Sequence, residues 1–116
     1  MGRDRELAGI LGLAFRSGQL VPGAEMSLNL IREDRAALVL LDPKAGGNTR
    51  KKLEDACAYR SVAVFTLTDG LLGQACGRAG MAAAAIRQGE LALQAQKILS
   101  MGEHGGNQQR IAEDKG

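Results

Sequence analysis

A stretch of cations and glycines follows a short apolar segment near the middle of the chain. Residues 36–41 are apolar and bounded by turn residues, which predicts a strand buried on both faces. Asn48 is a suitable N-cap for a following helix, yet residues 50–52 place three cations in its first turn. The helix dipole disfavours cations there. The pattern indicates an anion site beside Lys44, the alternative being an exposed basic helix end without a ligand.

Two other loops combine glycine with a cation or a helix start. Gly23 opens a predicted helix, and Arg78 lies in the glycine-flanked loop 77–80. Glycine permits close backbone approach, helix starts present N–H groups to phosphate, and Arg and Lys add charge. We expect these two loops and residues 44–52 to lie at one end of the fold, although each alone is also consistent with an ordinary turn.

The composition favours a structured RNA over a single strand. The chain has one Tyr, two Phe and no Trp, so it lacks the aromatic platform that single-strand binders use. Shape and phosphates are then the features left to recognise. The net charge of +2 is compatible with nucleic-acid binding but does not argue for it alone.

Catalytic chemistry has little support in the sequence. The single histidine, His104, falls in the polar tail, and neither Cys57 nor Cys76 has a plausible base partner. Both cysteines are predicted to be reduced core residues of a cytoplasmic protein. The glycines of residues 70–80 do not have dinucleotide-binding spacing. We predict no enzyme, no cofactor and no metal site.

Helices and short apolar strands alternate along the chain. This alternation predicts an α/β fold, a three-layer α-β-α sandwich with a small mixed sheet of about four strands. The domain covers residues 1–101, and residues 102–116 form a polar tail that we expect to be disordered. Asp4 is expected to cap the first helix, Gly18 to end it, and Thr68 or Asp69 to cap the fourth. The expected helices are 4–17, 23–33, 48–60, about 69–76 and 90–101, and the expected strands 19–22, 36–41, 62–67 and 81–86.

Two segments carry a family resemblance. They read Leu-Gly-x-Ala-Cys-Gly at residues 72–77 and Asn-Thr-x-Lys-Lys at residues 48–52. With them, the chain resembles the kink-turn-binding ribosomal proteins, that is ribosomal protein L-seven-Ae and its small bacterial relatives, over about residues 6–99. The resemblance implies a non-catalytic protein that binds kink turns, which are sharply bent RNA duplexes with sheared guanine–adenine pairs.

The resemblance also implies a contact surface, with departures from the family pattern. The family motif Gly-x-Asn-Glu-x-x-Lys falls on residues 23–29, where only the glycine is kept and Glu25, Met26 and Asn29 hold the other positions. Loop 78–80 matches the family loop that covers the RNA bend. The expected RNA-binding residues are Gly23, Ala24, Glu25, Met26 and Asn29 at the primary surface, Lys44, Arg50, Lys51 and Lys52 at phosphates, and Arg78, Ala79 and Gly80 over the bend.

The expected partner is a kink-turn or similarly bent RNA. Ribosomal RNA, a riboswitch and the ribosome are candidates, and we expect a monomer with no membrane contact. The alternative function is a protein-interaction module on the same fold that has lost kink-turn recognition, with Met26 in an apolar docking patch. A nucleotide-binding enzyme is a weaker third hypothesis.

Overall fold

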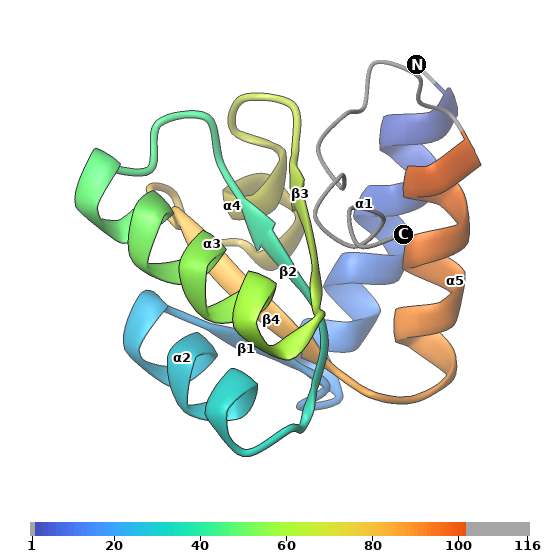
Figure 1. Ribbon diagram of the computed structural model, residues 1–116. Coiled ribbons are helices and arrows are strands. Elements are labelled where there is room, and N and C mark those ends of the chain that lie inside the picture. Colours follow the sequence, from blue (N-terminus) through green and yellow to red (C-terminus); the bar gives the residue numbers. More distant parts are fainter. Residues whose placement is uncertain (1, 102–116) are drawn as a thin grey trace.

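A four-stranded mixed sheet lies between two layers of helices (Figure 1). The computed structural model describes residues 2–101. The sheet order is β1-β4-β2-β3; β2 and β3 run parallel, and β4 runs antiparallel to both β1 and β2. This arrangement confirms the predicted α-β-α sandwich. The strands are β1 (Leu20–Pro22), β2 (Ala36–Leu41), β3 (Ala63–Thr66) and β4 (Ala83–Arg87).

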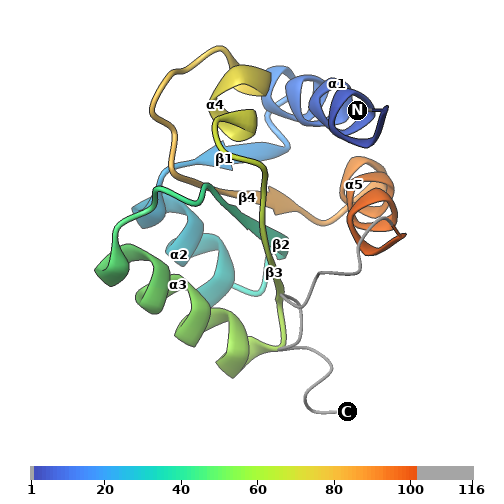
Figure 2. The same cartoon turned by 90° about the horizontal axis from the view of Figure 1, so that it is seen from above.

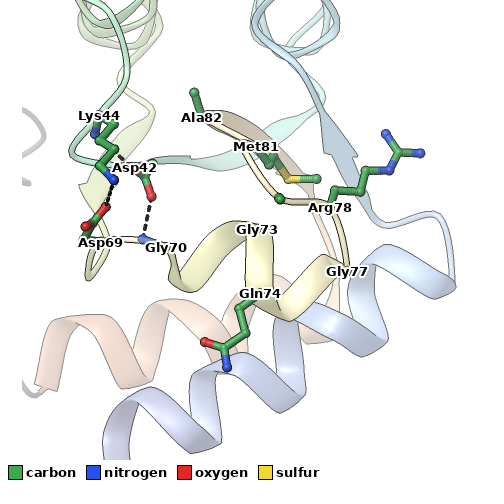
Figure 3. A pocket seen from close by; sticks show the side chains of 12 residues that line it. Asp42, Lys44, Asp69, Gly70, Gly73, Gln74, Gly77, Arg78, Met81 and Ala82 are labelled. Atoms are coloured by element: carbon green, nitrogen blue, oxygen red, sulfur yellow. Dashed lines mark hydrogen bonds and ion pairs between the residues drawn. The ribbon is translucent and has the colours of Figure 1, made fainter.

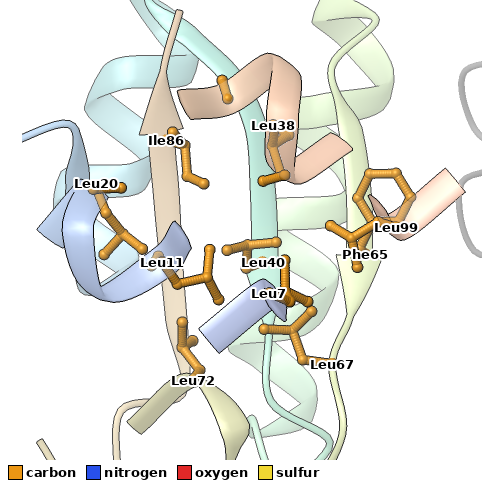
Figure 4. Close-up of a cluster of buried hydrophobic side chains, with 14 of the residues drawn as sticks. Leu7, Leu11, Leu20, Leu38, Leu40, Phe65, Leu67, Leu72, Ile86 and Leu99 are labelled. Carbon is orange, nitrogen blue, oxygen red and sulfur yellow. The ribbon is translucent and has the colours of Figure 1, made fainter. Parts of the chain in front are cut away.

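The helices are divided unequally between the faces of the sheet (Figure 2). One layer holds α1 (Gly2–Arg16), α4 (Leu71–Cys76) and α5 (Glu90–Met101), and the other holds α2 (Ala24–Arg32) and α3 (Gly47–Arg60). Strand β2 serves both layers because successive side chains of a strand point to opposite faces. Leu38 and Leu40 pack in the hydrophobic cluster beneath α1, α4 and α5 (Figure 4). Val39 and Leu41 pack in the cluster beneath α2 and α3.

Strand β4 is made largely of alanine, a helix-favouring residue, yet it forms a strand as predicted. It lies between β1 and β2, and Ala84 and Ala85 are fully buried. The ladder hydrogen bonds to two neighbours outweigh the weak local preference.

Three predicted helix starts are wrong. Helix α1 begins at Gly2, with Asp4 inside its first turn. Helix α3 is capped by Gly46 and not by Asn48, and α4 is capped by Gly70 and not by Thr68 or Asp69. Because both capping residues are glycines, neither helix start has a side-chain cap. The local rule fails at α4 because the Gly70 N–H finds a carboxylate distant in sequence, Asp42 Oδ2 at 2.8 Å.

The end of α1 is as expected. The N–H of Gly18 donates to Phe15 O at 3.2 Å, and the N–H of Gln19 donates to Ala14 O at 2.8 Å. This pair of bonds is a Schellman motif, with Gly18 at a φ of 81°.

Both cysteines are free and buried, as predicted. Burial raises the pKa of the Cys57 thiol to about 12, with Glu54 adding to the effect, and burial also raises the pKa of Cys76. Because the thiolate is the reactive form, a thiol reagent at pH 8 is expected to label native Cys57 far more slowly than the urea-unfolded chain. Rapid labelling of the native protein would contradict the buried placement.

Within residues 2–101, no helix combines the length and the apolar character needed to cross a membrane. The predicted tail, with His104, lies outside the described residues.

Candidate nucleic-acid interface

The topology brings the expected loops to one edge of the sheet. Strands β1, β2 and β3 run the same way, so their carboxyl ends meet the start of the antiparallel β4. Backbone hydrogen bonds tie the ends of β1 and β2 to the segment that enters β4. The N–H of Gly23 donates to Ala83 O, and the N–H of Asp42 donates to Ala82 O, both at 2.9 Å. The loops that begin at Gly23 and Asp42 therefore flank the segment that enters β4.

A hollow of about 380 Å³ lies between the β1–α2 turn at Gly23, the start of α3 and the loop before β4. We call it the Gly23 hollow. Its lining joins residues far apart in sequence: Pro22, Gly23, Ala24, Thr49, Arg78, Ala79, Gly80, Met81, Ala82 and Ala83.

Gly23 is suited to the rim of this hollow. It is exposed, caps α2, and has φ 98° and ψ 144°, a conformation that is strained for residues with a side chain. The first backbone N–H of α2 that bonds back into the helix is that of Ser27, to Gly23 O at 3.0 Å. The N–H groups before it are those that a helix start offers to anions.

Loop 77–80 is held firmly despite its exposure. Gly77 and Gly80 have positive φ values of 69° and 85°. The N–H of Arg78 donates to Gly73 O at 2.9 Å, and the Arg78 guanidinium lies 5.2 Å from the centroid of the Phe15 ring in α1. The Arg78 charge is thereby positioned beside the hollow.

A second hollow, of about 500 Å³, lies on the other side of the same loop (Figure 3). Asp42 forms one wall and is only 5% exposed. Its Oδ1 accepts the N–H of Lys44, and its Oδ2 accepts the N–H of Gly70, both at 2.8 Å. Asp42 thus ties the β2–α3 loop to the start of α4.

Arg50 is engaged within the protein. Its guanidinium donates to Thr66 Oγ1 at 3.1 Å and to Asp42 O at 3.3 Å, and pairs with Glu54 at 3.5 Å. The side chain is 28% exposed. Arg50 therefore fixes α3 to the ends of β2 and β3 and is a positioning residue more than an open cation.

The three lysines differ in their surroundings. Lys44 is paired with Asp69 at 3.5 Å, and Lys51 with Asp55 at 3.2 Å. Lys52 is exposed and makes no ion pair within residues 2–101. Exposed pairs of this kind are weak, so Lys44 and Lys51 remain available to an incoming anion.

The α2 residues expected at the primary surface reach solvent. Glu25, Met26 and Asn29 are exposed, Met26 at 52%. The Asn29 amide nitrogen lies 4.0 Å from Met26 Sδ. Ala24 is half-buried in the Gly23 hollow.

Two residues of this edge were not among the predicted site residues. Thr49 lines the Gly23 hollow, and its place directly before the cationic stretch was the available signal. Asp42 had a signal too, because an Asp-Pro after a strand favours a side-chain turn of the kind that Lys44 N–H completes. No group of His, Cys, Asp or Glu within residues 2–101 is arranged to hold a metal ion.

Comparison with known proteins decides the family. The profile of the "Ribosomal protein L7Ae/L30e/S12e/Gadd45 family" matches residues 5–95. The chain belongs to this family. The predicted resemblance is thereby confirmed, and membership of the L7Ae/L30e family supports the prediction that the chain is not an enzyme.

Two bacterial proteins are similar in sequence to this L7Ae/L30e member. It is 39% identical over 70 residues to the RNA-binding protein YlxQ of Bacillus subtilis, covering 60% of this chain and 70% of that protein. It is 35% identical over 66 residues to the RNA-binding protein YlxQ of Enterococcus faecium, covering 57% of this chain and 64% of that protein. The match thus spans less than two thirds of the Enterococcus protein.

Solved structures agree on the fold. A Bacillus halodurans protein of unknown function superposes with a TM-score of 0.74 at 27% identity, covering 79% of this chain and 94% of that one. The Giardia lamblia 15.5kD RNA binding protein superposes with a TM-score of 0.67 at 17% identity, covering 85% and 92%. The second likeness is one of fold alone.

Proposed function

We propose that this L7Ae/L30e protein binds a structured RNA in the cytoplasm, and that the RNA is bent in the manner of a kink turn. One observation supports the proposal most directly: segments from three separate parts of the chain gather glycines, a helix start and the cation Arg78 around the Gly23 hollow. Lys44 lines the neighbouring hollow, on the other side of loop 77–80. The names of the YlxQ relatives support RNA as the ligand. Ribosomal RNA, a riboswitch and the intact ribosome are the candidate sources.

The proposed contacts follow the exposure of each group. Gly23 and Ala24 let the RNA backbone approach the start of α2, while Glu25, Met26 and Asn29 face the bases. Loop 78–80 packs over the bend, and Lys44, Lys51 and Lys52 meet phosphates, with Arg50 holding α3 in place.

Titration of a kink-turn RNA tests the proposal. We expect binding that weakens with salt, with a slope of log affinity against log salt of roughly −2 to −4 for a few phosphate contacts. A duplex of the same length without the bend serves as the control. Absence of binding to the bent RNA at low salt would refute the proposal, and sequencing of RNA recovered with the protein would identify the natural ligand.

A charge reversal separates RNA contact from stability. The double variant Lys51→Glu with Lys52→Glu is expected to weaken RNA binding by about tenfold or more and to flatten the salt slope, because phosphate contacts are replaced by repulsion. The melting temperature should change little, since exposed charges contribute little to folding.

The matched control reverses two exposed cations on the other layer, Arg5 of α1 and Lys97 of α5. The net charge changes equally, so the control should retain nearly all of the affinity. Equal losses in the two double variants would indicate attraction to overall charge and not a defined surface.

The exposure of Met26 favours one second candidate, a protein-docking module on the same fold. In that case Met26→Lys would abolish capture of a protein partner while the bent RNA fails to bind wild type. RNA binding by wild type that Lys51→Glu with Lys52→Glu weakens would exclude this candidate as the main function.

A further inference from the structure

A third hollow, of about 590 Å³, lies between α2 and α3, away from the sheet edge. We call it the α2–α3 groove. The two helices lie side by side on one face of the sheet (Figures 1 and 2). The groove is lined by Leu28, Ile31, Arg32, Lys52, Asp55, Ala56, Tyr59 and Arg60.

The groove continues the proposed RNA surface along one face of α3. Thr49 lines the Gly23 hollow, and Lys52, Ala56 and Tyr59 line the groove. Positions three or four apart share a helix face, so these residues form one stripe. At 1.5 Å per residue, the stripe runs about 15 Å from Thr49 to Tyr59.

The groove exposes an aromatic ring. Tyr59 is the only tyrosine of the chain, and the residue is 83% exposed. The Arg60 guanidinium lies 5.7 Å from the ring centroid and is itself fixed by Asp34, whose two carboxylate oxygens each accept a bond from Arg60 Nη1 at 3.0 Å. Arg60 holds the ring from one side and the rest of the ring is open to solvent, so one base can stack on it. A single ring is less than the platform of a dedicated single-strand binder, so it suits a short segment beside a structured RNA.

The charge around the ring favours a polyanion. Arg32 and Lys52 are exposed and make no ion pair among the described residues. Asp55, the acid of the groove, is already paired with Lys51 at 3.2 Å. The apolar floor offers little to a protein helix, because Leu28 is 4% exposed and Ile31 is fully buried.

We propose that the α2–α3 groove binds a single-stranded RNA segment that leaves the bent RNA, with a base stacked on Tyr59 and phosphates at Arg32 and Lys52. This proposal rests on the proposed function and extends its footprint. Lys52 lies where the two surfaces meet.

The test compares a kink-turn RNA with flush ends and the same RNA carrying a six-nucleotide single-stranded tail at its 5′ or 3′ end. One tail is expected to raise the affinity roughly tenfold, the gain from about one stacked base. Tyr59→Ala should remove this gain without changing the binding of the flush RNA, whereas Tyr59→Phe should keep it. Arg32→Glu should reduce it.

Tyrosine emission gives an independent readout, because the chain has no Trp and Tyr59 is its only Tyr. The tailed RNA is expected to quench this emission, and the flush RNA to leave it nearly unchanged. If flush RNA binds but neither tail adds affinity nor quenches Tyr59, the groove proposal is overturned and the proposed function stands.

If the bent RNA does not bind at all, the proposed function fails and hexauridylate alone still tests the groove. Quenching of Tyr59 at low salt that Arg32→Glu diminishes would support the groove, and no quenching would overturn it. Equal quenching by an oligoglutamate peptide would overturn it in favour of an acidic protein partner.

Discussion

Gly73→Ala is expected to lower the free energy of unfolding by about 1–3 kcal/mol, the usual cost of overpacking. A Cβ at Gly73 would lie 2.7 Å from the backbone oxygen of Arg78, too close for the loop to stay where it is. The N–H of Arg78 donates to the Gly73 carbonyl, so the added methyl also strains that bond. Urea unfolding measures the change directly.

The displaced loop should also weaken RNA binding, since it carries Arg78 to Gly80 along both hollows of the sheet edge. Gly47→Ala is the matched control: a Cβ there meets nothing within 4 Å, and Gly47 is the first residue of α3. Alanine is the better helix former, so this variant should be as stable as wild type or slightly more so. Equal stability of both variants would contradict the tight approach at Gly73.

Asp42→Ala is expected to lower the free energy of unfolding by about 2–4 kcal/mol. The buried carboxylate accepts two N–H groups, from Lys44 and Gly70. Hydrogen bonds to charged groups contribute about 1.5–3 kcal/mol, and removing the acceptor leaves donors unsatisfied. Asp42→Asn keeps one acceptor oxygen of the two, so its loss should be intermediate. Thermal and urea unfolding of the three proteins measure the series.

Asp69→Ala provides the control at the same hollow. Asp69 is exposed, and its pair with Lys44 spans 3.5 Å, so the free energy of unfolding should fall by less than about 1 kcal/mol. Freed from Asp69, Lys44 should bind phosphate at least as well as in wild type. If Asp42→Ala were as mild as Asp69→Ala, Asp42 would not be the tie between the two loops.

Prediction from the sequence was most accurate where one interaction dominates. The apolar run of β2 required burial on both faces, and the structure divides Leu38 and Val39 between two clusters. Gly18 ended α1 because few other residues adopt its backbone conformation. The predicted caps Asn48 and Thr68 were wrong, although both residue types cap helices well. Helix α3 is capped by Gly46 instead, and α4 by Gly70, whose N–H bonds the distant Asp42 carboxylate.

The sequence by itself determined the order of helices and strands and the loops that carry glycine and cations, because these depend on local preference and on burial. Its motifs, and not these preferences, pointed to the family. Only the tertiary structure decided which cations are open. Arg50 looked like Lys51 and Lys52 in the sequence, yet it bonds Thr66 and the Asp42 carbonyl. That difference depends on the ends of β2 and β3 meeting α3, contacts between residues far apart in the chain that no local pattern encodes.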